Sequence, residues 1–172
     1  IINIDYELKL YNGIGQEEKK SVSKIMDTGL LSGFYGNWGK EFYGGPNVRD
    51  LERNWSTKFK TKYSVSVNSA ASGLTAAVGA AKISPGDEVL VPAISWSTTY
   101  FPLQQYGLKL KFIDVDPKTL NMDINSVRKN ISKKTKLILV VSILGNPAEL
   151  PELKRICNKK KIYLMEDNCE SM

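Results

Sequence analysis

Strand-like and helix-like segments alternate along the chain from about residue 63 to its end, and this alternation limits the possible folds more than any other feature. Runs rich in β-branched and aromatic residues predict strands at residues 63–67, 88–92, 109–115, 136–141 and 161–165. The intervening segments predict helices at residues 70–82, 97–106, 125–130 and 149–159. Repeated βα units of this length favour an α/β fold, with a mainly parallel, doubly wound sheet and helices on both faces.

The first 45 residues lack this alternation and are expected to form an N-terminal arm. An amphipathic helix is predicted at residues 16–28, closed by Gly29. The glycine-aromatic segment at residues 33–45 predicts a loop, since glycine-rich sequence disfavours regular structure. A second helix, capped by Asn47, is predicted to run to Phe59. We therefore expect an arm and loop at residues 1–45 and the beginning of a larger domain at residues 46–172.

Composition excludes several kinds of site. The 172 residues are 42% hydrophobic, which is enough for a sizeable core, and they include no histidine. Two cysteines, Cys157 and Cys169, match neither a disulfide framework nor metal-ligand spacing, so zinc sites and Ser-His or Cys-His catalysis are excluded within this chain. The net charge of +6 comes from scattered lysines, which argues against nucleic acid as a partner. With no long apolar stretch and no signal peptide, we expect no membrane partner and a cytoplasmic location.

The run at residues 161–165 delivers two acids, Glu166 and Asp167, to the carboxyl edge of the predicted sheet, where open α/β folds bind ligands. A buried acid there is costly unless it meets a cation, a metal or a protonated ring nitrogen. Asp167 could instead pair with a lysine or cap the next segment. Glu170 could face a ligand or solvent, and Cys169 is interpreted as a packing residue that forms no thiolate.

Two further features point to the same edge. Ala70, Ala71 and Ser72 begin a helix of small residues, where backbone N–H groups and the helix dipole suit a phosphate; alternatively, Ser69 caps that helix and nothing more. Trp96 follows a predicted strand, so its indole either stacks on a flat heterocycle or packs in the core. Together with Asp167, these features describe a ligand that is anionic at one end, planar in the middle and basic at a ring nitrogen.

An ordered set of segments resembles the PLP-dependent nucleotide-sugar aminotransferases, which have the fold-type I aminotransferase architecture. The resemblance runs from about Gly44 to Met172 and is carried by residues 67–74 (VNSAASGL), 85–89 (PGDEV), 91–93 (VPA), Trp96, 112–116 (FIDVD), 134–136 (KTK), 145–147 (GNP) and 166–170 (EDNCE).

The resemblance implies that the cofactor is pyridoxal 5′-phosphate (PLP) and assigns a role to each of these residues. The backbone at Ala70 and Ala71 and the Ser72 hydroxyl would hold its phosphate, Trp96 would stack on its ring, Asp167 would pair with its pyridinium nitrogen, and Glu170 would lie near its ring hydroxyl. Residues 46–172 would be the N-terminal part of the PLP-binding large domain. The Schiff-base lysine and the small C-terminal domain would lie beyond Met172, so we expect the chain to be a fragment, inactive alone, of a homodimeric enzyme.

The activity implied is transfer of an amino group, from an amino acid such as glutamate, to a nucleotide-linked keto-deoxysugar in polysaccharide or lipopolysaccharide precursor synthesis. Two departures from the usual pattern weaken individual roles: Ala71 replaces a common hydroxyl residue of the phosphate site, and Ser142 replaces a common histidine. A third supports an alternative on the same fold, because the acid at Glu170 after Glu-Asp-Asn-Cys is typical of the sugar 3-dehydratase branch, and residues 97–100 (STTY) and 144–147 (LGNP) favour the same branch. An alternative of another class is a non-catalytic regulator that binds a sugar nucleotide.

Overall fold

A computed structural model describes residues 13–31 and 33–171, and the chain divides into two compact units, residues 1–66 and 67–172. The first unit contains α1 (Gln16–Thr28), the 3-10 helix η1 (Lys40–Tyr43) and α2 (Pro46–Phe59). As predicted, α1 is closed by Gly29, whose φ of 68° is left-handed. The cap predicted for α2 is wrong, because Pro46 is already the first helical residue and Gly45 is the cap.

The strand predicted at residues 63–67 is also wrong. Ser66 in this segment forms hydrogen bonds with α2 rather than with a neighbouring strand. Glu52 Oε1 accepts hydrogen bonds from the Ser66 N–H at 2.7 Å and the Ser66 hydroxyl at 2.9 Å. Val65 is left 80% exposed. The alternating pattern that predicted this strand describes a chain suited to a sheet, but a strand also needs a hydrogen-bonded neighbour.

The second unit is built on a four-stranded, wholly parallel sheet in the order β2-β1-β3-β4. The other four predicted strands are confirmed, with shifts of up to two residues at their ends. In chain order the elements are α3 (Ala70–Ala80), β1 (Glu88–Pro92), α4 (Ser97–Gln105), β2 (Lys109–Ile113), α5 (Ile124–Asn130), β3 (Thr135–Val141), the 3-10 helix η2 (Ile143–Gly145), α6 (Leu150–Lys160) and β4 (Tyr163–Asp167).

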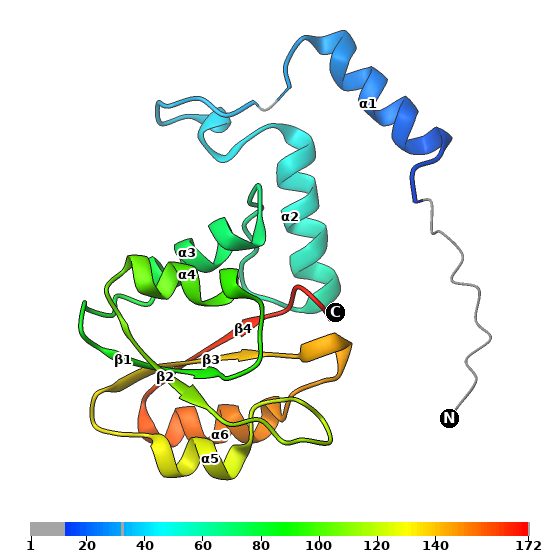
Figure 1. Cartoon of the computed structure of the whole chain (residues 1–172). Helices are drawn as coiled ribbons and strands as arrows, with labels where there is room; N and C mark the ends of the chain where they lie inside the picture. Colours follow the sequence, from blue (N-terminus) through cyan, green and yellow to red (C-terminus); the bar gives the residue numbers. More distant parts are fainter. Residues whose placement is uncertain (1–12, 32, 172) are drawn as a thin grey trace, which may run out of the picture. The chain divides into compact units, whose positions relative to one another are not determined.

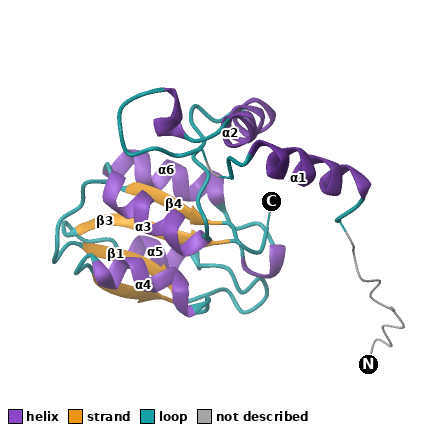
Figure 2. Cartoon of the chain, turned by 90° about the horizontal axis from the view of Figure 1, so that it is seen from above, coloured by secondary structure: helices purple, strands orange, loops and turns teal. Residues whose placement is uncertain are grey.

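Helices cover both faces of the sheet, as predicted (Figures 1 and 2). On one face Val89, Val91 and Leu139 share a core with Leu74 of α3 and Leu103 of α4. On the other face Leu90, Ile138 and Val140 share a core with residues of α5 and α6. Because β3 is buried on both sides, its sequence is a continuous hydrophobic run rather than an alternating one.

The order of the strands creates a crevice at the carboxyl edge. From β1 the chain passes through α4 to β2 on one side, then crosses back to β3 and β4 on the other. Strand order therefore reverses between β1 and β3, and the carboxyl ends of these two strands mark the point where doubly wound sheets bind ligands.

Helices α3 and α4 both begin at this edge. Their carboxyl ends meet at Gly79, where an added Cβ would lie 2.6 Å from the Tyr106 hydroxyl. Helix α4 starts shortly after the carboxyl end of β1, and α3 packs against α4 in the same direction. The first turn of α3 therefore lies near the carboxyl edge of the sheet.

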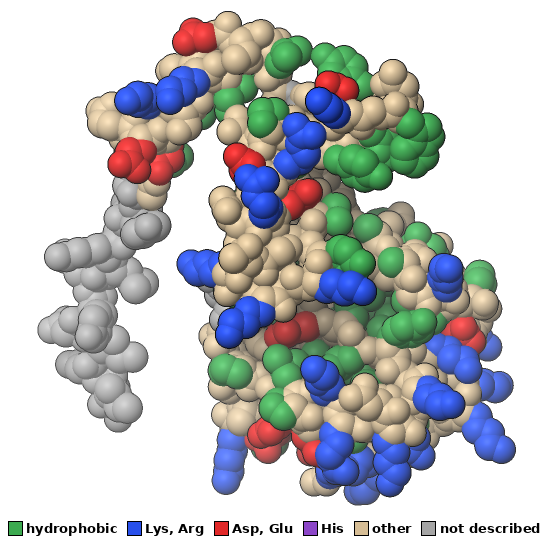
Figure 3. Space-filling view, turned by 180° about the vertical axis from the view of Figure 1, so that it is seen from behind, with side chains coloured by type: hydrophobic (Ala, Val, Ile, Leu, Met, Phe, Trp, Pro, Cys, Tyr) green, Lys and Arg blue, Asp and Glu red, His purple; other side chains and the backbone are tan. Residues whose placement is uncertain are grey.

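The lysines are less evenly scattered than expected. Figure 3 shows Lys and Arg side chains gathered toward the end of the second unit where α5 and α6 lie, and one hollow there is lined by Lys133, Lys136, Lys160 and Lys161. Across residues 13–31 and 33–171, no helix has both the length and the apolar character needed to span a bilayer.

Glu88 joins β1 to β3 at the amino edge of the sheet. Its Oε1 accepts hydrogen bonds from the Thr135 hydroxyl at 2.5 Å and the Ser132 hydroxyl at 2.9 Å. Burial alone would raise the pKa of Glu88, but these two hydrogen bonds, with the nearby Lys111 and Lys134, outweigh it and lower the pKa below its ordinary value.

Replacing Glu88 with glutamine should therefore make stability less dependent on pH. Because the folded-state pKa lies below the unfolded-state pKa of about 4.3, the carboxylate stabilises the fold above that pH, and this contribution is lost as the pH falls through the folded-state pKa. Urea unfolding should show the wild type more stable than Glu88→Gln at pH 7, with a difference that shrinks in acid. Thr135→Val should reduce the same pH dependence, whereas a constant difference at every pH would contradict this account.

Candidate functional site

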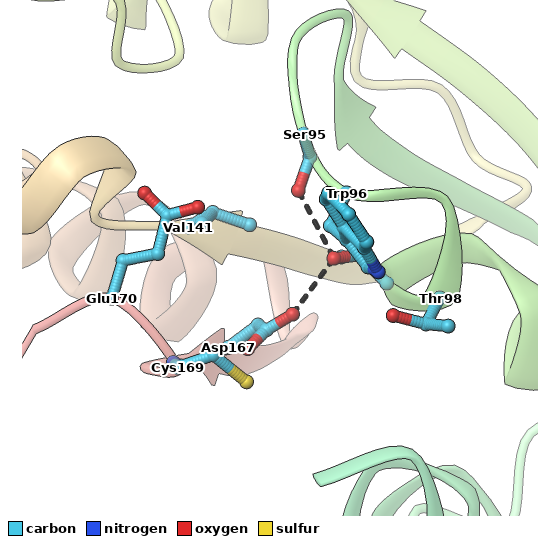
Figure 4. Close-up of a pocket in the computed structure, with 8 residues that line it drawn as sticks. Ser95, Trp96, Thr98, Val141, Asp167, Cys169 and Glu170 are labelled. Atoms are coloured by element: carbon cyan, nitrogen blue, oxygen red, sulfur yellow. Dashed lines mark hydrogen bonds between the residues drawn. The ribbon is translucent and has the colours of Figure 1, made fainter.

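A cavity of about 310 Å³ opens at the carboxyl edge of the sheet, where the strand order reverses (Figure 4). Its walls come from three separate segments: residues 95–99 after β1, Val141 at the end of β3, and residues 167–170 at the end of β4. The volume is at the lower end of the range of about 300–1,000 Å³ for small-molecule sites. The fold thus brings Trp96, Asp167 and Glu170, three of the predicted site residues, into one pocket.

Asp167 is the buried charge of this pocket, with 6% of its surface exposed. The Thr99 hydroxyl donates a hydrogen bond to Oδ2 at 2.8 Å, and the Cys169 N–H donates to Oδ1 at 3.2 Å. The second bond closes a local turn between Asp167 and Cys169. No lysine or arginine of the described residues forms an ion pair with it, so its donors there are neutral.

Sequence reasoning did not assign Thr99 to the site, and the structure brings it to this acid. Thr99 lies in the first turn of α4, is 1% exposed, and its hydroxyl is 3.0 Å from that of Ser95. Its partner is 68 residues away in the chain. Ser95 and Thr99 stand four residues apart across a helix start, but that spacing by itself also fits ordinary capping.

Trp96 is a surface residue rather than a core residue. It is 70% exposed, stands as the N-cap of α4 and lines the cavity (Figure 4). Core packing is therefore excluded for Trp96, and its aromatic face is available to a ligand.

The first turn of α3 does not line the cavity, although it begins at the same edge of the sheet. Ser69 is the N-cap: its Oγ accepts the Ser72 N–H at 3.2 Å and lies 3.0 Å from the Ser72 hydroxyl. The capping interpretation is thus correct for Ser69. Because the N–H groups of Ala70 and Ala71 belong to the first turn, the helix itself offers them no carbonyl partner. Phosphate binding by Ala70, Ala71 and Ser72 remains a prediction that this geometry permits.

Glu170 lines the cavity and braces the neighbouring loop. Its Oε2 accepts a hydrogen bond from the N–H of Leu144 in η2. Leu144 has a φ of 53°, which is uncommon for a residue with a side chain. Beside it, Ser142 donates to Glu166 Oε1 at 3.0 Å and accepts the Ala148 N–H at 3.3 Å. Ser142, where the resemblance led us to note a missing histidine, is thus a buried link between β4 and the loop after β3.

Cys169 is exposed beside Asp167, so its interpretation as a packing residue is wrong. The pKa of the thiol is raised to about 11. The largest cause is a hydrogen bond between the Cys169 and Asp167 side chains, followed by partial burial and by the charges of Asp167 and Glu170. The expectation that it forms no thiolate is therefore consistent with its surroundings.

The acids that follow β2 stabilise a local turn and the start of a helix. Asp116 Oδ1 accepts the N–H groups of Lys118 and Thr119, and Asp123 caps α5. Within the part of the chain that the structure describes, no group of three potential ligands could hold a metal ion.

We expect Cys169 to react slowly with iodoacetamide despite its exposure. A thiol with a pKa near 11 has about 10²-fold less thiolate at pH 8 than an ordinary cysteine, and its greater nucleophilicity recovers about tenfold. Peptide mass spectrometry should therefore show labelling at least about tenfold slower than for a free cysteine, and Asp167→Asn should accelerate it because the main cause of the raised pKa is removed. Labelling at the ordinary rate would contradict the assigned contact.

Comparison with known proteins agrees with this geometry. A family model described as the DegT/DnrJ/EryC1/StrS aminotransferase family matches residues 15–172. The GDP-4-keto-6-deoxy-D-mannose 3-dehydratase of Yersinia pseudotuberculosis is 40% identical over 163 residues, which cover 91% of this chain and 39% of that protein. The chain thus spans about two-fifths of the length of the relatives it matches.

Solved structures give the same result for the fold. A GDP-4-keto-6-deoxymannose-3-dehydratase, crystallised with a trapped PLP-glutamate geminal diamine, matches with a TM-score of 0.83 at 37% identity, over 94% of this chain and 41% of that one. An aminotransferase from Psychrobacter cryohalolentis has a TM-score of 0.83 at 23% identity, over 95% of this chain and 39% of that one, and this match shows the fold alone. The resemblance to fold-type I enzymes is confirmed, and the chain belongs to the DegT/DnrJ/EryC1/StrS aminotransferase family.

Proposed function

We propose that this chain supplies part of the cofactor site of a PLP-dependent nucleotide-sugar 3-dehydratase. The observation that carries the proposal is the buried Asp167 carboxylate, which faces a cavity beside an exposed tryptophan and has neutral donors as its described partners. Dehydration replaces the amino transfer first expected, because the relatives that are 37–40% identical are named 3-dehydratases.

The charge of the buried Asp167 carboxylate is complementary to the protonated ring nitrogen of PLP. A carboxylate buried without a cation is destabilising, and a protonated pyridine nitrogen would supply the missing positive charge. When bound, PLP draws electrons from the substrate through that protonated ring. The role of Asp167 in this chain is to hold the proton on the ring nitrogen, and we propose Asp167 as the catalytic residue of the described segment.

The remaining predicted residues have supporting roles. Trp96 offers an aromatic surface over the cavity, so that a flat ring could lie against it. The N–H groups of Ala70 and Ala71, with the Ser72 hydroxyl, would bind the phosphate at the start of α3. Glu170 would lie near the ring, with one oxygen already committed to the Leu144 N–H.

For the substrate, we propose a nucleotide-linked 4-keto-6-deoxysugar, with glutamate as the amino donor to the cofactor. The names of the Yersinia relative and of the PLP-glutamate structure support both assignments by similarity. A homodimer and a cytoplasmic location are part of the same proposal, and they rest on the family resemblance.

The products of a single reaction distinguish the three candidate functions. The protein expressed from its complete gene would be incubated with PLP, glutamate and GDP-4-keto-6-deoxymannose, and the nucleotide sugars analysed by mass spectrometry. A product that lacks the 3-hydroxyl oxygen supports dehydration. A product in which an amino group replaces the keto oxygen would instead establish amino transfer, and a bound but unchanged sugar nucleotide would favour a regulator.

Asp167→Asn should abolish most of the activity while it preserves the shape of the pocket. Asparagine can still accept the Thr99 hydrogen bond, but it has no charge to hold a proton on the ring nitrogen. The rate should fall by about two to three orders of magnitude, as it does when a preorganised electrostatic partner is removed. Asp87→Asn, at the opposite edge of the sheet, serves as the control; equal rates in the two variants would contradict the role of Asp167.

A further inference from the structure

We propose that Thr99 is a positioning residue: with Ser95 behind it, its hydroxyl orients the Asp167 carboxylate, so that the shared proton stays on the cofactor's ring nitrogen. This inference rests on the proposed PLP function and adds two residues that neither the sequence motifs nor the resemblance assigned to the site. Both residues line the cavity, and Figure 4 draws the two hydrogen bonds that connect Ser95 to Asp167.

The direction of these hydrogen bonds follows from the number of protons available. An ionised carboxylate can only accept, so Thr99 donates to Asp167 Oδ2 across 2.8 Å. A threonine hydroxyl has one proton, which this bond uses. The hydrogen in the 3.0 Å contact between Ser95 and Thr99 must therefore come from Ser95. Ser95 thus donates to Thr99, and Thr99 donates to the Asp167 carboxylate.

These two hydrogen bonds lie in a buried place, where donors affect a carboxylate most strongly. Thr99 is 1% exposed and Asp167 6%, so water does not screen the contact. Hydrogen bonds donated to a carboxylate favour its charged form, and the low local dielectric strengthens them. On the other oxygen, Oδ1, the Cys169 N–H donates at the longer distance of 3.2 Å.

Thr99 also connects the charge to the aromatic surface. Its N–H donates to the Trp96 carbonyl at 3.0 Å, while its side chain holds Asp167. One residue in the first turn of α4 thus fixes the stacking residue through the backbone and the acid through the hydroxyl. Any displacement of this turn would move both groups relative to the ligand.

Thr99→Val keeps the shape of the side chain and removes the donor. Without that donor the carboxylate loses one of its hydrogen bonds, so the proton shared with the ring nitrogen should move toward Asp167. The protein from the complete gene would be loaded with PLP labelled with ¹⁵N in the ring, and the chemical shift of that nitrogen measured. We expect the shift to move toward that of a neutral pyridine in Thr99→Val and to return to the wild-type value in Thr99→Ser.

Thr135→Val is a matched control. Thr135 is likewise a buried threonine that donates to a carboxylate, that of Glu88, but it lies at the amino edge of the sheet, away from the cavity. Its loss should destabilise the fold without altering the ring nitrogen. Ser95→Ala tests the outer half of the chain, with a smaller displacement expected in the same direction, and provides the measurement if Thr99→Val does not fold.

The outcomes separate this inference from the proposed function. If the wild-type protein binds no PLP, the proposed function fails. If it binds PLP and the ring nitrogen of both Thr99→Val and Ser95→Ala resembles the wild type, Thr99 merely supports the fold and the inference is overturned. A displacement that also appears in Thr135→Val would overturn it too, because general destabilisation would then be the cause.

Discussion

The carboxylate of Asp167, buried at the carboxyl edge of the sheet, is the constraint that organises the second unit. An isolated charge in such a place costs several kcal/mol even after the protein relaxes around it. Two neutral donors, the Thr99 hydroxyl and the Cys169 N–H, offset part of that cost without cancelling the charge. Asp167 thus has no opposite charge among the described residues, and this is the basis of its proposed pairing with a cationic ring nitrogen.

The pairing of β3 with β4 determines the face of the sheet on which the Asp167 side chain lies. Val141 pairs with Asp167 and Val140 with Glu166, so β3 and β4 end together at the crevice. Because successive side chains in a strand alternate, Asp167 lies on the α4 face near Thr99, and Glu166 on the opposite face with Ser142. A shift of the register by one residue would exchange the two acids and bring Glu166 toward Thr99.

Sequence patterns predicted the sheet well wherever both faces of a strand are buried, since a continuous hydrophobic run reports burial directly. They were wrong for residues 63–67, because alternation cannot reveal whether a strand has a neighbour to pair with. The positions of Asp167 and Trp96 could be predicted because both lie near the carboxyl end of a predicted strand. Thr99 could not be, since its role depends on a partner 68 residues away that only the fold brings near. At Ser69 and Ser72 the local pattern fits both a helix cap and part of a phosphate site, so sequence alone leaves both interpretations open.

Three acids lie within five residues at the end of the chain, and the structure gives each a different partner. Glu166 accepts from the Ser142 hydroxyl, Asp167 from the Thr99 hydroxyl, and Glu170 from the Leu144 N–H. Each donor gives one carboxylate oxygen a hydrogen-bond partner. Of the three, Asp167 alone is buried, and a charge acts most strongly where the dielectric is low. Glu166 and Glu170 therefore brace the loops of the pocket, and Asp167 is the acid suited to hold a proton on a bound ring.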